Sequence, residues 1–276
     1  MAFLDRAPFD PAKAAPTERT RHMLDAALAG AAAIAAGRER VEGAALTLKG
    51  QRDFQTQSDV ASERAITAHL TAIFPDHGLQ GEEETDIDGT AGRFLIDPID
   101  GTTNFAWGLP FFGICIALVE DGETVAGVVY DPSLEEAFVA ERGLGAFVNG
   151  RRLAINRTLT PDEAVIGASL PVPGQVKTVP VEDYHRALRA IMDRASGMRR
   201  LGSAALSLCY VAAGRHDAFF EDGLSPHDYA AAALIASEAG AIVSGFDGAP
   251  IPASGAVLAS NASLHPWLVE LLSNRA

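Results

Sequence analysis

The chain has 276 residues, enough to bury a large core as one large domain or two smaller ones. With 48% hydrophobic and 21% charged residues, its composition is that of a globular protein. The net charge of −14 argues against nucleic-acid binding driven by phosphate neutralisation, and it favours a metal ion wherever a phosphorylated substrate must approach.

The N-terminal stretch and the cysteines indicate the compartment. The residues before Thr17 include acids and prolines where a signal peptide has an apolar run, and no segment approaches the about 20 apolar residues of a transmembrane helix. Cys115 lies in an apolar run and Cys209 in a predicted helix, so we expect two buried, reduced thiols rather than a disulfide. Together these features predict a cytoplasmic protein.

The first predicted elements are two helices separated by a polar segment. The first helix follows the N-cap Thr17 and ends near Gly37, with apolar residues at helical spacing. Residues 42–58 are expected to form a loop or hairpin, and Ser58 opens the second helix. The buried stripe of that helix is predicted to consist of Ile66, Leu70 and Ile73.

Short β-type runs separated by turn dipeptides follow these helices. They predict an antiparallel meander with strands over residues 111–119, 124–130, 137–140 and 146–148. After a boundary near Asn156 the pattern alternates, with strands predicted at 165–170, 218–221 and 257–259 and helices at 184–192, 203–213, 228–238 and 263–272. We therefore expect an α/β (α+β) protein, with helices and a mainly antiparallel sheet in residues 1–155 and a smaller α/β half in residues 156–276.

The stretch RFLIDPIDGTTNF, from Arg93 to Phe105, has the most distinctive pattern in the chain. An apolar strand ends in Asp97, and a second carboxylate, Asp100, follows three residues later. The small residues after Asp100 leave backbone N–H groups for an anion at the start of a turn or short helix, and the predicted helix after Gly202 offers a second such place. Two acids beside exposed N–H groups suit a cation and a phosphate held side by side.

Two other acids are candidate metal ligands. Glu82 belongs to a GEEE run just before this stretch, where a solvated turn is the simpler interpretation. Asp228 opens a predicted helix, where by itself it would be an N-cap. Asp97, Asp100 and the outward carbonyl of Ile99 complete an oxygen-rich set of the kind that Mg²⁺ prefers. Two such ions can clamp a phosphoryl group.

These motifs resemble those of the inositol monophosphatase family of Mg²⁺-dependent, lithium-sensitive phosphatases. The resemblance covers roughly residues 17–270 and is carried by LIDPIDGTTNF, GEEE, GSAALSLCYVAAGRHDAFFEDG and PHDYAAAALIASEAGA. It implies the layered αβαβα sandwich shared with fructose-1,6-bisphosphatases, a homodimer, and about two or three Mg²⁺ ions as cofactor. It also implies a small phosphorylated alcohol as substrate, with no direct nucleic-acid or membrane partner.

The resemblance further implies roles for individual residues. The metal ligands would be Glu82, Asp97, the Ile99 carbonyl, Asp100 and Asp228. Glu82 would also orient the attacking water, and Thr102 with Asp59 would help to activate it. The substrate is expected to contact Gly101, Thr102, Thr103, Gly202, Ser203, Ala204, Glu221 and Asp228.

The resemblance extends to three further positions, of which His227 and Lys49 depart from the family's pattern. His227 stands where the family usually has tryptophan, and we favour a packing role with one polar contact over a role in binding substrate or water. Lys49 resembles the lysine of a mobile loop near a third metal site, in a segment that is slightly short. Glu83 resembles a neighbour of the metal ligands that does not itself touch the ions.

The predicted reaction is the in-line attack of a metal-activated water on a phosphate monoester, with no covalent protein nucleophile. Inositol-1-monophosphate is the first expected substrate and histidinol phosphate the runner-up, ahead of bisphosphate nucleotides and fructose bisphosphate. Some members of this family bind the transcription machinery, so a mainly regulatory binding protein is the alternative of a different class. Intact acids at all four ligand positions favour the enzyme.

Overall fold

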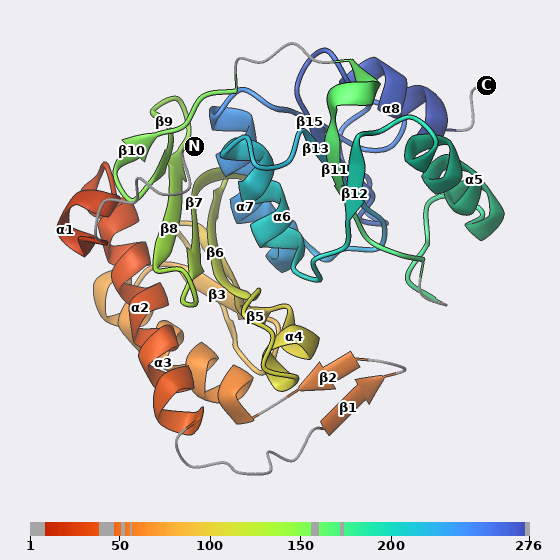
Figure 1. Ribbon diagram of the computed structural model, residues 1–276. Helices are drawn as coiled ribbons and strands as arrows, with labels where there is room; N and C mark the ends of the chain where they lie inside the picture. Colours follow the sequence, from red (N-terminus) through yellow and green to blue (C-terminus); the bar gives the residue numbers. More distant parts are fainter. Residues whose placement is uncertain are drawn as a thin grey trace.

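The computed structural model describes residues 9–38, 47–50, 53–55, 57–155, 160–171 and 174–273, and the side chains of residues 38, 47–50 and 53–55 lie outside this description. Its helices and sheets stack in five layers in the order αβαβα, as predicted (Figure 1). Within the described residues, no helix has the length and apolar character needed to cross a membrane.

One outer layer consists of α1 (Pro11–Ala14), α2 (Glu18–Arg38) and α3 (Gln57–Ile73). α2 begins as predicted, because the Thr17 hydroxyl accepts a hydrogen bond of 3.2 Å from the backbone N–H of Thr20. The segment before α3 contains a hairpin of β1 (Thr47–Gly50) and β2 (Asp53–Gln55), which confirms the hairpin alternative for these residues.

The predicted buried stripe of α3 is correct in part. Ile66 and Leu70 are fully buried, but Ile73 is 42% exposed, so its prediction is wrong. Ile73 is the last residue of the helix, and the next residue, Phe74, packs on the sheet with its ring centroid 5.2 Å from that of Phe94. The chain leaves helical spacing there, so Phe74 takes the apolar contact predicted for Ile73.

The larger sheet has eight strands in the order β10-β9-β8-β7-β6-β5-β3-β4. Its strands are β3 (Gly78–Gly81), β4 (Asp86–Ile87), β5 (Arg93–Asp100), β6 (Gly113–Glu120), β7 (Glu123–Asp131), β8 (Glu136–Glu141), β9 (Gly145–Val148) and β10 (Arg151–Arg152). The antiparallel pairing from β5 to β10 confirms the predicted meander, and β3 joins β5 in parallel. A short helix, α4 (Thr102–Ala106), follows β5.

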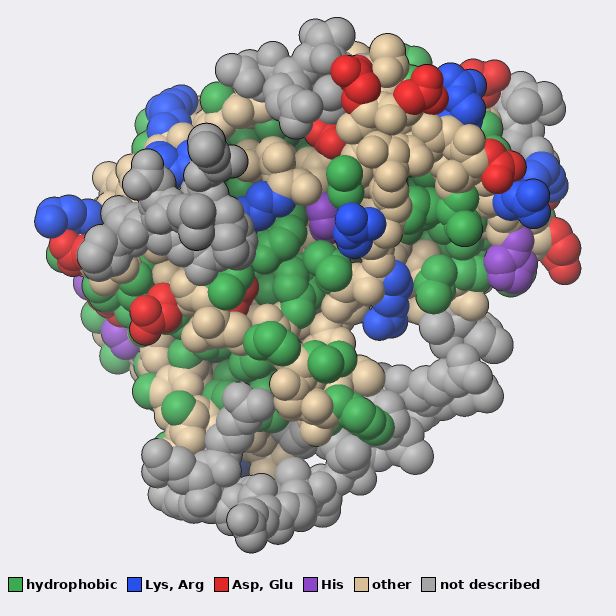
Figure 2. All heavy atoms as spheres, viewed as in Figure 1, with side chains coloured by type: hydrophobic (Ala, Val, Ile, Leu, Met, Phe, Trp, Pro, Cys, Tyr) green, Lys and Arg blue, Asp and Glu red, His purple; other side chains and the backbone are tan. Residues whose placement is uncertain are grey.

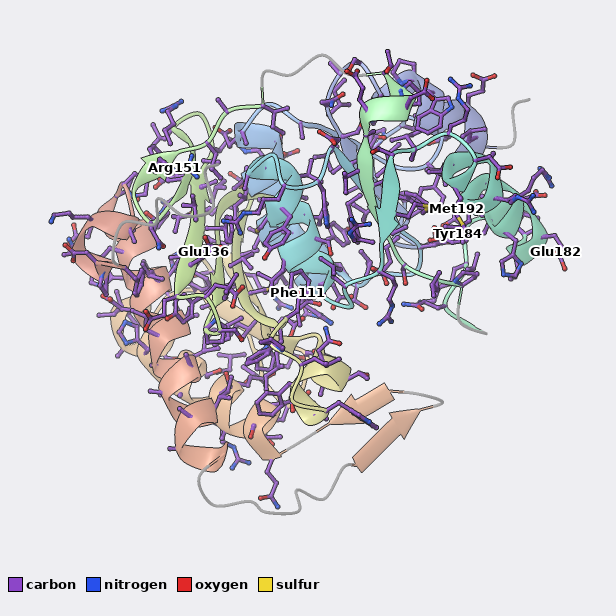
Figure 3. The ribbon with its side chains drawn as sticks, in the orientation of Figure 1. Phe111, Glu136, Arg151, Glu182, Tyr184 and Met192 are labelled. Atoms are coloured by element: carbon purple, nitrogen blue, oxygen red, sulfur yellow. The ribbon has the colours of Figure 1, made fainter. Side chains whose placement is uncertain are left out.

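The middle layer consists of α6 (Ala204–Ala212) and α7 (Pro226–Glu238), which pack between the two sheets. The second sheet has the order β12-β11-β13-β15-β14, and its outer face is covered by α5 (Val181–Met192) and α8 (His265–Leu272). Tyr184 of α5 is buried in this outer layer (Figure 3), with its ring centroid 5.8 Å from that of Phe220. The strands are β11 (Val165–Ala168), β12 (Gly197–Arg199), β13 (Ala218–Glu221), β14 (Ile242–Ser244) and β15 (Val257–Ser260), with a 3-10 turn at Pro161–Glu163.

Both faces of the larger sheet are buried, so alternate residues of a strand enter different cores. On β6, Ile114, Ile116 and Leu118 pack with α2 and α3, whereas Cys115 packs with α6 and α7. This arrangement explains the continuous apolar run in the sequence. Cys115 and Cys209 are both buried free thiols, as predicted.

The remaining differences from the predicted elements lie in short elements. The sequence pattern finds β11, β13 and β15 but misses the four-residue helix α1 and the strands β3, β4, β10, β12 and β14, which have four residues or fewer and weak alternation. β3, for example, reads Gly-Leu-Gln-Gly and depends on its pairing with β5. The boundary near Asn156 lies outside the described residues, and the division into 1–155 and 156–276 stays a prediction.

Several contacts join the second half of the chain to the larger sheet. Arg215, after α6, makes a bidentate ion pair with Glu136 of β8, with both N–O distances at 2.6 Å. Gly127 of β7 lies against the backbone of α7, since a Cβ built at Gly127 would be 2.7 Å from the carbonyl oxygen of Ala231. The middle layer therefore packs directly on the main chain of the sheet.

The close approach at Gly127 predicts that Gly127→Ala destabilises the protein. Elsewhere in a strand, replacing glycine by alanine ordinarily stabilises the folded state. Because the obstructing atom belongs to the backbone of α7, we expect a loss of about 1–3 kcal/mol in the free energy of unfolding, measured by denaturant titration. Gly197→Ala is the control, since its Cβ would meet only the flexible Arg199 side chain. Equal stability of the two variants would contradict this packing.

Burial of His216 predicts a pH-dependent stability. His216 is 5% exposed with its ring 5.5 Å from that of Tyr210, and burial lowers the pKa of the imidazole to about 4. Between about pH 6.5 and 4 the unfolded chain binds a proton that the folded chain does not, so stability falls as the pH falls.

Because of His216, we expect the free energy of unfolding to be up to about 2 kcal/mol lower at pH 5 than at pH 7. Urea unfolding at both pH values would show a smaller pH dependence for His216→Asn than for wild type. The exposed His185→Asn variant is the control and should keep the wild-type pH dependence.

Candidate active site

A β-bulge at the end of β5 positions the two aspartates of the motif. Asp97 pairs with Cys115 and Asp100 with Gly113, so three steps along β5 match two along β6. Pro98 occupies the bulge, where a strand tolerates the loss of a backbone donor. Because side chains alternate across a sheet, the extra residue allows two aspartates at odd spacing to turn toward the same side.

The N-terminus of α6 holds the carboxylate of Asp100. This carboxylate accepts hydrogen bonds from the N–H groups of Ala204 (3.2 Å) and Ala205 (2.8 Å) and from the hydroxyl of Ser203. Ser203 is also the N-cap, since its hydroxyl accepts from the N–H of Leu206. The sequence predicts an anion at this helix start, and the structure places the protein's own carboxylate there.

The position of Glu82 depends on Glu63, a fully buried acid of α3. Glu63 accepts three hydrogen bonds of 2.7–2.9 Å from the N–H groups of residues 83–85. A Cβ at Gly81 would lie 2.3 Å from the Glu63 carboxylate, so this position requires glycine. The N–H of Glu82 also donates to the Ile96 carbonyl at 3.0 Å. The GEEE run is a partly exposed turn, as the simpler interpretation has it, but its backbone is fixed against α3 and β5.

Thr102 and Asp59 are in contact although 43 residues separate them. The hydroxyl of Thr102 lies 3.3 Å from Oδ1 of Asp59 and 3.0 Å from the carbonyl oxygen of Ile99. One turn further along α3, the Ser62 hydroxyl donates to the Pro98 carbonyl at 3.3 Å. A polar face of α3 thus contacts both the bulge and the helix that follows it.

Asp228 is the third residue of α7, and Ser225 is the N-cap, so the N-cap interpretation of Asp228 is wrong. Oδ2 of Asp228 accepts a 2.7 Å hydrogen bond from the N–H of Ser225, which completes a capping box. Nε2 of His227 lies 3.4 Å from Oδ1 of Asp228. This contact places His227 against the candidate metal ligand beside it.

Burial and mutual repulsion raise the pKa values of the two motif aspartates. Burial raises the pKa of Asp97 well above its ordinary value, and the charges of Glu82, Asp100 and Asp228 raise it further. Burial also raises the pKa of Asp100 to about 7, against the lowering effect of its hydrogen bond with Ser203. These acids repel one another and need a positive charge among them.

The donor set fits divalent cations. Four carboxylates and the Ile99 carbonyl are hard oxygen ligands, which Mg²⁺ prefers. Two ligands of one Mg²⁺ ion lie at most about 4.2 Å apart. Among the described side chains, no three of these carboxylates have oxygens within 4.8 Å of one another. The acids are therefore spread more widely than the ligand set of a single ion.

A pocket of about 840 Å³ opens beside this acidic cluster. The predicted site residues that line it are Asp100, Thr103, Gly202, Ser203, Ala204, Glu221 and Asp228. The other predicted residues, Asp59, Glu82, Asp97, Ile99, Gly101 and Thr102, do not line it. Figure 2 shows hydrophobic side chains, with Lys or Arg side chains beside them, on the face that carries α4 and α6. The pocket thus joins most of the predicted substrate contacts.

The far wall of the pocket is built on two acids at the end of β13. Burial raises the pKa of Glu221 to about 8, and its Oε1 accepts a 3.0 Å hydrogen bond from Nε2 of Gln175. The buried Asp222 accepts hydrogen bonds from the N–H groups of Lys177 and Thr178, at 2.8 and 2.7 Å. Asp222 therefore holds the pocket loop in place.

Three of the lining residues that were not predicted from the sequence change the chemical character of the pocket. Lys177 and Arg200 bring positive charge to a pocket that otherwise contains acids, and Trp107, 58% exposed, adds an apolar surface. Glu63 and Ser62 were also missed. Their spacing from Asp59 in a predicted helix was the available signal, since residues three and four apart share a helix face.

Two glycines meet where the first half of the chain contacts the second. Gly101 has a φ of 98°, and its Cβ would lie 3.1 Å from the carbonyl oxygen of Gly202, which itself has a φ of 87°. The amide of Asn104 bridges the same contact by donating to the carbonyls of Phe111 and Leu201, both at 2.7 Å. Phe111 also packs against α6 (Figure 3).

The structure places two predicted neighbours of the site, Lys49 and Glu83, through their backbone. Lys49 lies in β1, and its side chain is outside the described residues. Glu83 contributes its backbone N–H to the Glu63 carboxylate at 2.8 Å. The predicted third metal site near Lys49 stays a prediction.

Comparison with known proteins gives consistent matches. A family model described as the inositol monophosphatase family matches residues 16–276. An inositol-1-monophosphatase of Mesorhizobium japonicum is 40% identical over 242 residues, covering 87% of this chain and 90% of its own length. The Nus factor SuhB of Pseudomonas aeruginosa is 40% identical over 215 residues, covering 76% and 79%.

A solved structure matches over nearly the whole chain. The extragenic suppressor protein suhB from Bartonella henselae superposes with a TM-score of 0.87 at 36% identity, covering 94% of this chain and all of that one. The superposed part of the chain contains both sheets and the helices of all five layers, so the two proteins share this fold.

The repulsion within the acidic cluster predicts opposite effects of Asp97→Asn on stability and on metal response. Without divalent cations, loss of one buried charge should raise the free energy of unfolding by about 1–2 kcal/mol, because Asn still accepts from the Ile99 N–H. Added Mg²⁺ should raise the melting temperature of wild type more than that of the variant.

Asp86→Asn, at an exposed site, is the control for this pair of measurements. It should behave like wild type with and without Mg²⁺. An Asp97→Asn protein that is less stable than wild type without cations, or that responds equally to Mg²⁺, would contradict the assignment.

Proposed function

Because the chain belongs to the inositol monophosphatase family, a family of phosphatases, we propose that it is a Mg²⁺-dependent inositol-1-monophosphatase. The observation that supports this most directly is the meeting of Glu82, Asp97, Asp100 and Asp228 beside a pocket of about 840 Å³. Burial of repelling carboxylates is unfavourable unless cations bind among them. A phosphate ester in the pocket would approach those cations.

The proposed metal-binding groups are Glu82, Asp97, the Ile99 carbonyl, Asp100 and Asp228. Bound Mg²⁺ would supply Lewis acidity and neutralise the charge of the phosphoryl group. The chain's own contribution is to hold these oxygens in place through bonds made before any ion arrives. The N–H groups of Ala204 and Ala205 fix Asp100, and the N–H of Ser225 fixes Asp228.

Thr102 and Asp59 are proposed to accept the proton of the attacking water. A hydroxyl has one proton, so Thr102 can donate to Asp59 or to the Ile99 carbonyl, but not to both. When Oγ1 donates to Asp59, its lone pairs are free to accept a hydrogen bond from water. A proton leaving that water can pass through Oγ1 of Thr102 to the carboxylate of Asp59, with Glu82 orienting the water.

The pocket supports a polyhydroxylated substrate. We propose that the N–H groups at Gly101, Thr102 and Thr103 hold the phosphate, and that Glu221 accepts hydrogen bonds from hydroxyl groups of the alcohol. Gln175 orients Glu221 through the 3.0 Å hydrogen bond between them. The remaining proposed contacts to the substrate are Gly202, Ser203, Ala204 and Asp228.

Histidinol phosphate is the alternative substrate with the same chemistry. Its ammonium group would be attracted by Asp228 but repelled by Lys177 and Arg200, which line the same pocket. The uncharged hydroxyl groups of inositol are repelled neither by the acids nor by the basic residues of the pocket. The lining charges therefore favour inositol monophosphate over histidinol phosphate.

A regulatory binding protein is the alternative of another class. It is supported by the 40% identity to a Nus factor SuhB, which equals the identity to an inositol-1-monophosphatase. Recovery of a stoichiometric macromolecular partner with the full chain, together with negligible phosphatase turnover, would support it over the enzyme. We further propose a cytoplasmic homodimer that is inhibited by lithium, properties to be tested by sedimentation, fractionation and inhibition assays.

Loss of the Thr102 hydroxyl should reduce turnover without unfolding the protein. For Thr102→Val we expect kcat to fall by about 10²–10⁴, with a smaller change in KM, because the hydroxyl acts on the water rather than on the bound substrate. Phosphate release with saturating Mg²⁺ measures this. Thr90→Val, at an exposed position outside the site, is the control and should keep wild-type kcat. Wild-type turnover in Thr102→Val would remove Thr102 from the mechanism.

The substrate is tested by comparing kcat/KM for a panel of phosphate monoesters with Mg²⁺. We expect the highest value for inositol-1-phosphate, ahead of histidinol phosphate, a bisphosphate nucleotide and fructose 1,6-bisphosphate. Arg200→Ala should narrow the difference between the first two, because it removes a charge that repels an ammonium group. A preference of wild type for histidinol phosphate would reverse the proposed order.

A further inference from the structure

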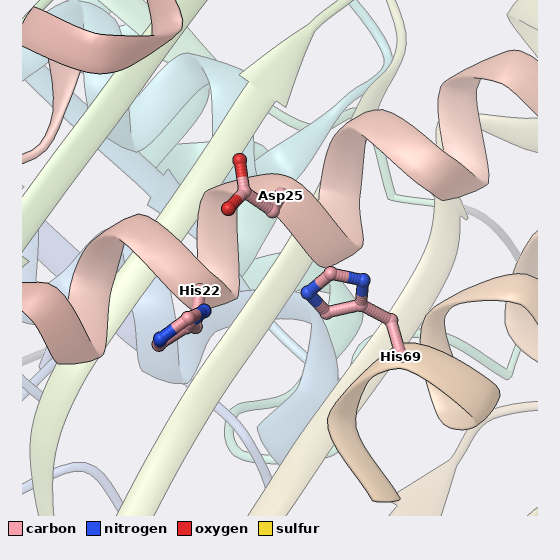
Figure 4. A group of neighbouring side chains, drawn as sticks. All are labelled: His22, Asp25 and His69. Atoms are coloured by element: carbon pink, nitrogen blue, oxygen red, sulfur yellow. The ribbon is translucent and has the colours of Figure 1, made fainter. Parts of the chain in front are cut away.

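A second group of ligand side chains lies in the outer helix layer, apart from the acidic cluster. His22 and Asp25 of α2 and His69 of α3 each place one ligand atom within 4.8 Å of the others (Figure 4). It is the one such group of three His, Cys, Asp or Glu side chains among the described residues. None of the three side chains contributes to the proposed phosphatase chemistry.

The packing of α2 on α3 fixes this group. Gly30 of α2 lies so close to α3 that a Cβ there would be 2.7 Å from the hydroxyl of Ser62 and 2.9 Å from the side chain of Ile66. The two helices are therefore held at short range one to two turns from the group. His22 and Asp25, three residues apart, share the face of α2 that His69 approaches.

The imidazole of His69 has an unmet bonding requirement. Its Nε2 atom is buried and has no hydrogen-bond partner within the described part of the chain. Figure 4 shows the His69 ring extending from α3 toward α2, where the side chains of His22 and Asp25 lie. A buried ring nitrogen without a partner is unfavourable, and a bound cation would satisfy it.

Negative charge gathers at the same place. The Asp25 carboxylate belongs to the group itself, and Oε1 of Glu18, one turn before His22 on α2, lies 3.8 Å from Nε2 of His22. The same oxygen of Glu18 lies 3.5 Å from the Arg21 guanidinium, so the Asp25 carboxylate is the negative charge that favours a cation here.

We propose that His22, Asp25 and His69 form a binding site for a transition-metal dication, with zinc as the preferred ion. Two imidazole nitrogens and one carboxylate oxygen suit Zn²⁺, whereas Mg²⁺ prefers oxygen ligands alone. Bonds of about 2.0–2.2 Å in tetrahedral geometry need ligand atoms about 3.3 Å apart. His22 and Asp25 are partly exposed, so rotation of their side chains can close the present spacing and leave the fourth position to water.

Such an ion would connect α2 to α3 without entering the phosphatase site. His69 is ten residues from Asp59 on α3, or about 15 Å along the helix axis. The ion would therefore stabilise the helix whose Asp59 contacts Thr102 and whose Glu63 fixes the GEEE run. It would act on stability and not on the chemical step.

The test is zinc binding to the chelator-treated full chain in the presence of excess Mg²⁺, which occupies oxygen sites. Equilibrium dialysis should give one Zn²⁺ per chain for wild type and also for Asp97→Asn, in which the acidic cluster is impaired. We expect Zn²⁺ affinity to fall at least tenfold in Asp25→Asn and about a hundredfold in His69→Gln. Zn²⁺ should raise the melting temperature of wild type but not that of His69→Gln.

His185→Gln is the matched control, because His185 is an exposed histidine of α5 outside the group. It should bind Zn²⁺ as wild type does. If His69→Gln does not fold, the partly exposed positions decide the question through Asp25→Asn and His22→Gln. Unchanged Zn²⁺ affinity in these variants, or failure of wild type to retain Zn²⁺ in excess Mg²⁺, would overturn the proposal.

Discussion

The constraint on which this structure depends is the assembly of four carboxylates at the bulged end of one strand. Such a cluster is unfavourable in a buried place, as the raised pKa values of Asp97 and Asp100 show. Each acid is nevertheless held by a backbone donor or by a neighbour that is itself held. Asp97 accepts from Ile99, Asp100 accepts from the start of α6, and Asp228 accepts from Ser225. The protein thus fixes the acids locally and leaves their net charge for cations to neutralise.

Two elements hold the cluster together. α3 contributes Asp59, Ser62 and Glu63, which contact α4, the bulge and the turn after β3. α6 receives the carboxylate of Asp100 at its N-terminus and so joins the second half of the chain to β5. The site can therefore exist only when the outer helices, the larger sheet and the middle layer are packed together.

The pocket beside the cluster is where the choice of substrate lies. It combines acids with Lys177 and Arg200, and its loop is fixed by the buried Asp222. The proposed zinc group at His22, Asp25 and His69 lies on the other end of α3, so a single helix would link a structural ion to the proposed catalytic acids. The C-terminal part of α3 would then bind the stabilising ion through His69, and its N-terminal part would supply the proposed catalytic Asp59.

The sequence by itself determined the meander and the acidic residues around Asp97, because apolar alternation, turn dipeptides and the Asp-Pro-Ile-Asp-Gly stretch are local patterns that can be recognised without the rest of the chain. The layered fold followed from the resemblance of these motifs to those of the inositol monophosphatase family. Only the tertiary structure decided that Ser203 and Ala204 bond to Asp100, that Glu63 fixes the GEEE run, and that His69 meets α2. These contacts join residues far apart in the chain, so their partners depend on how helices and sheets pack, which no local pattern records.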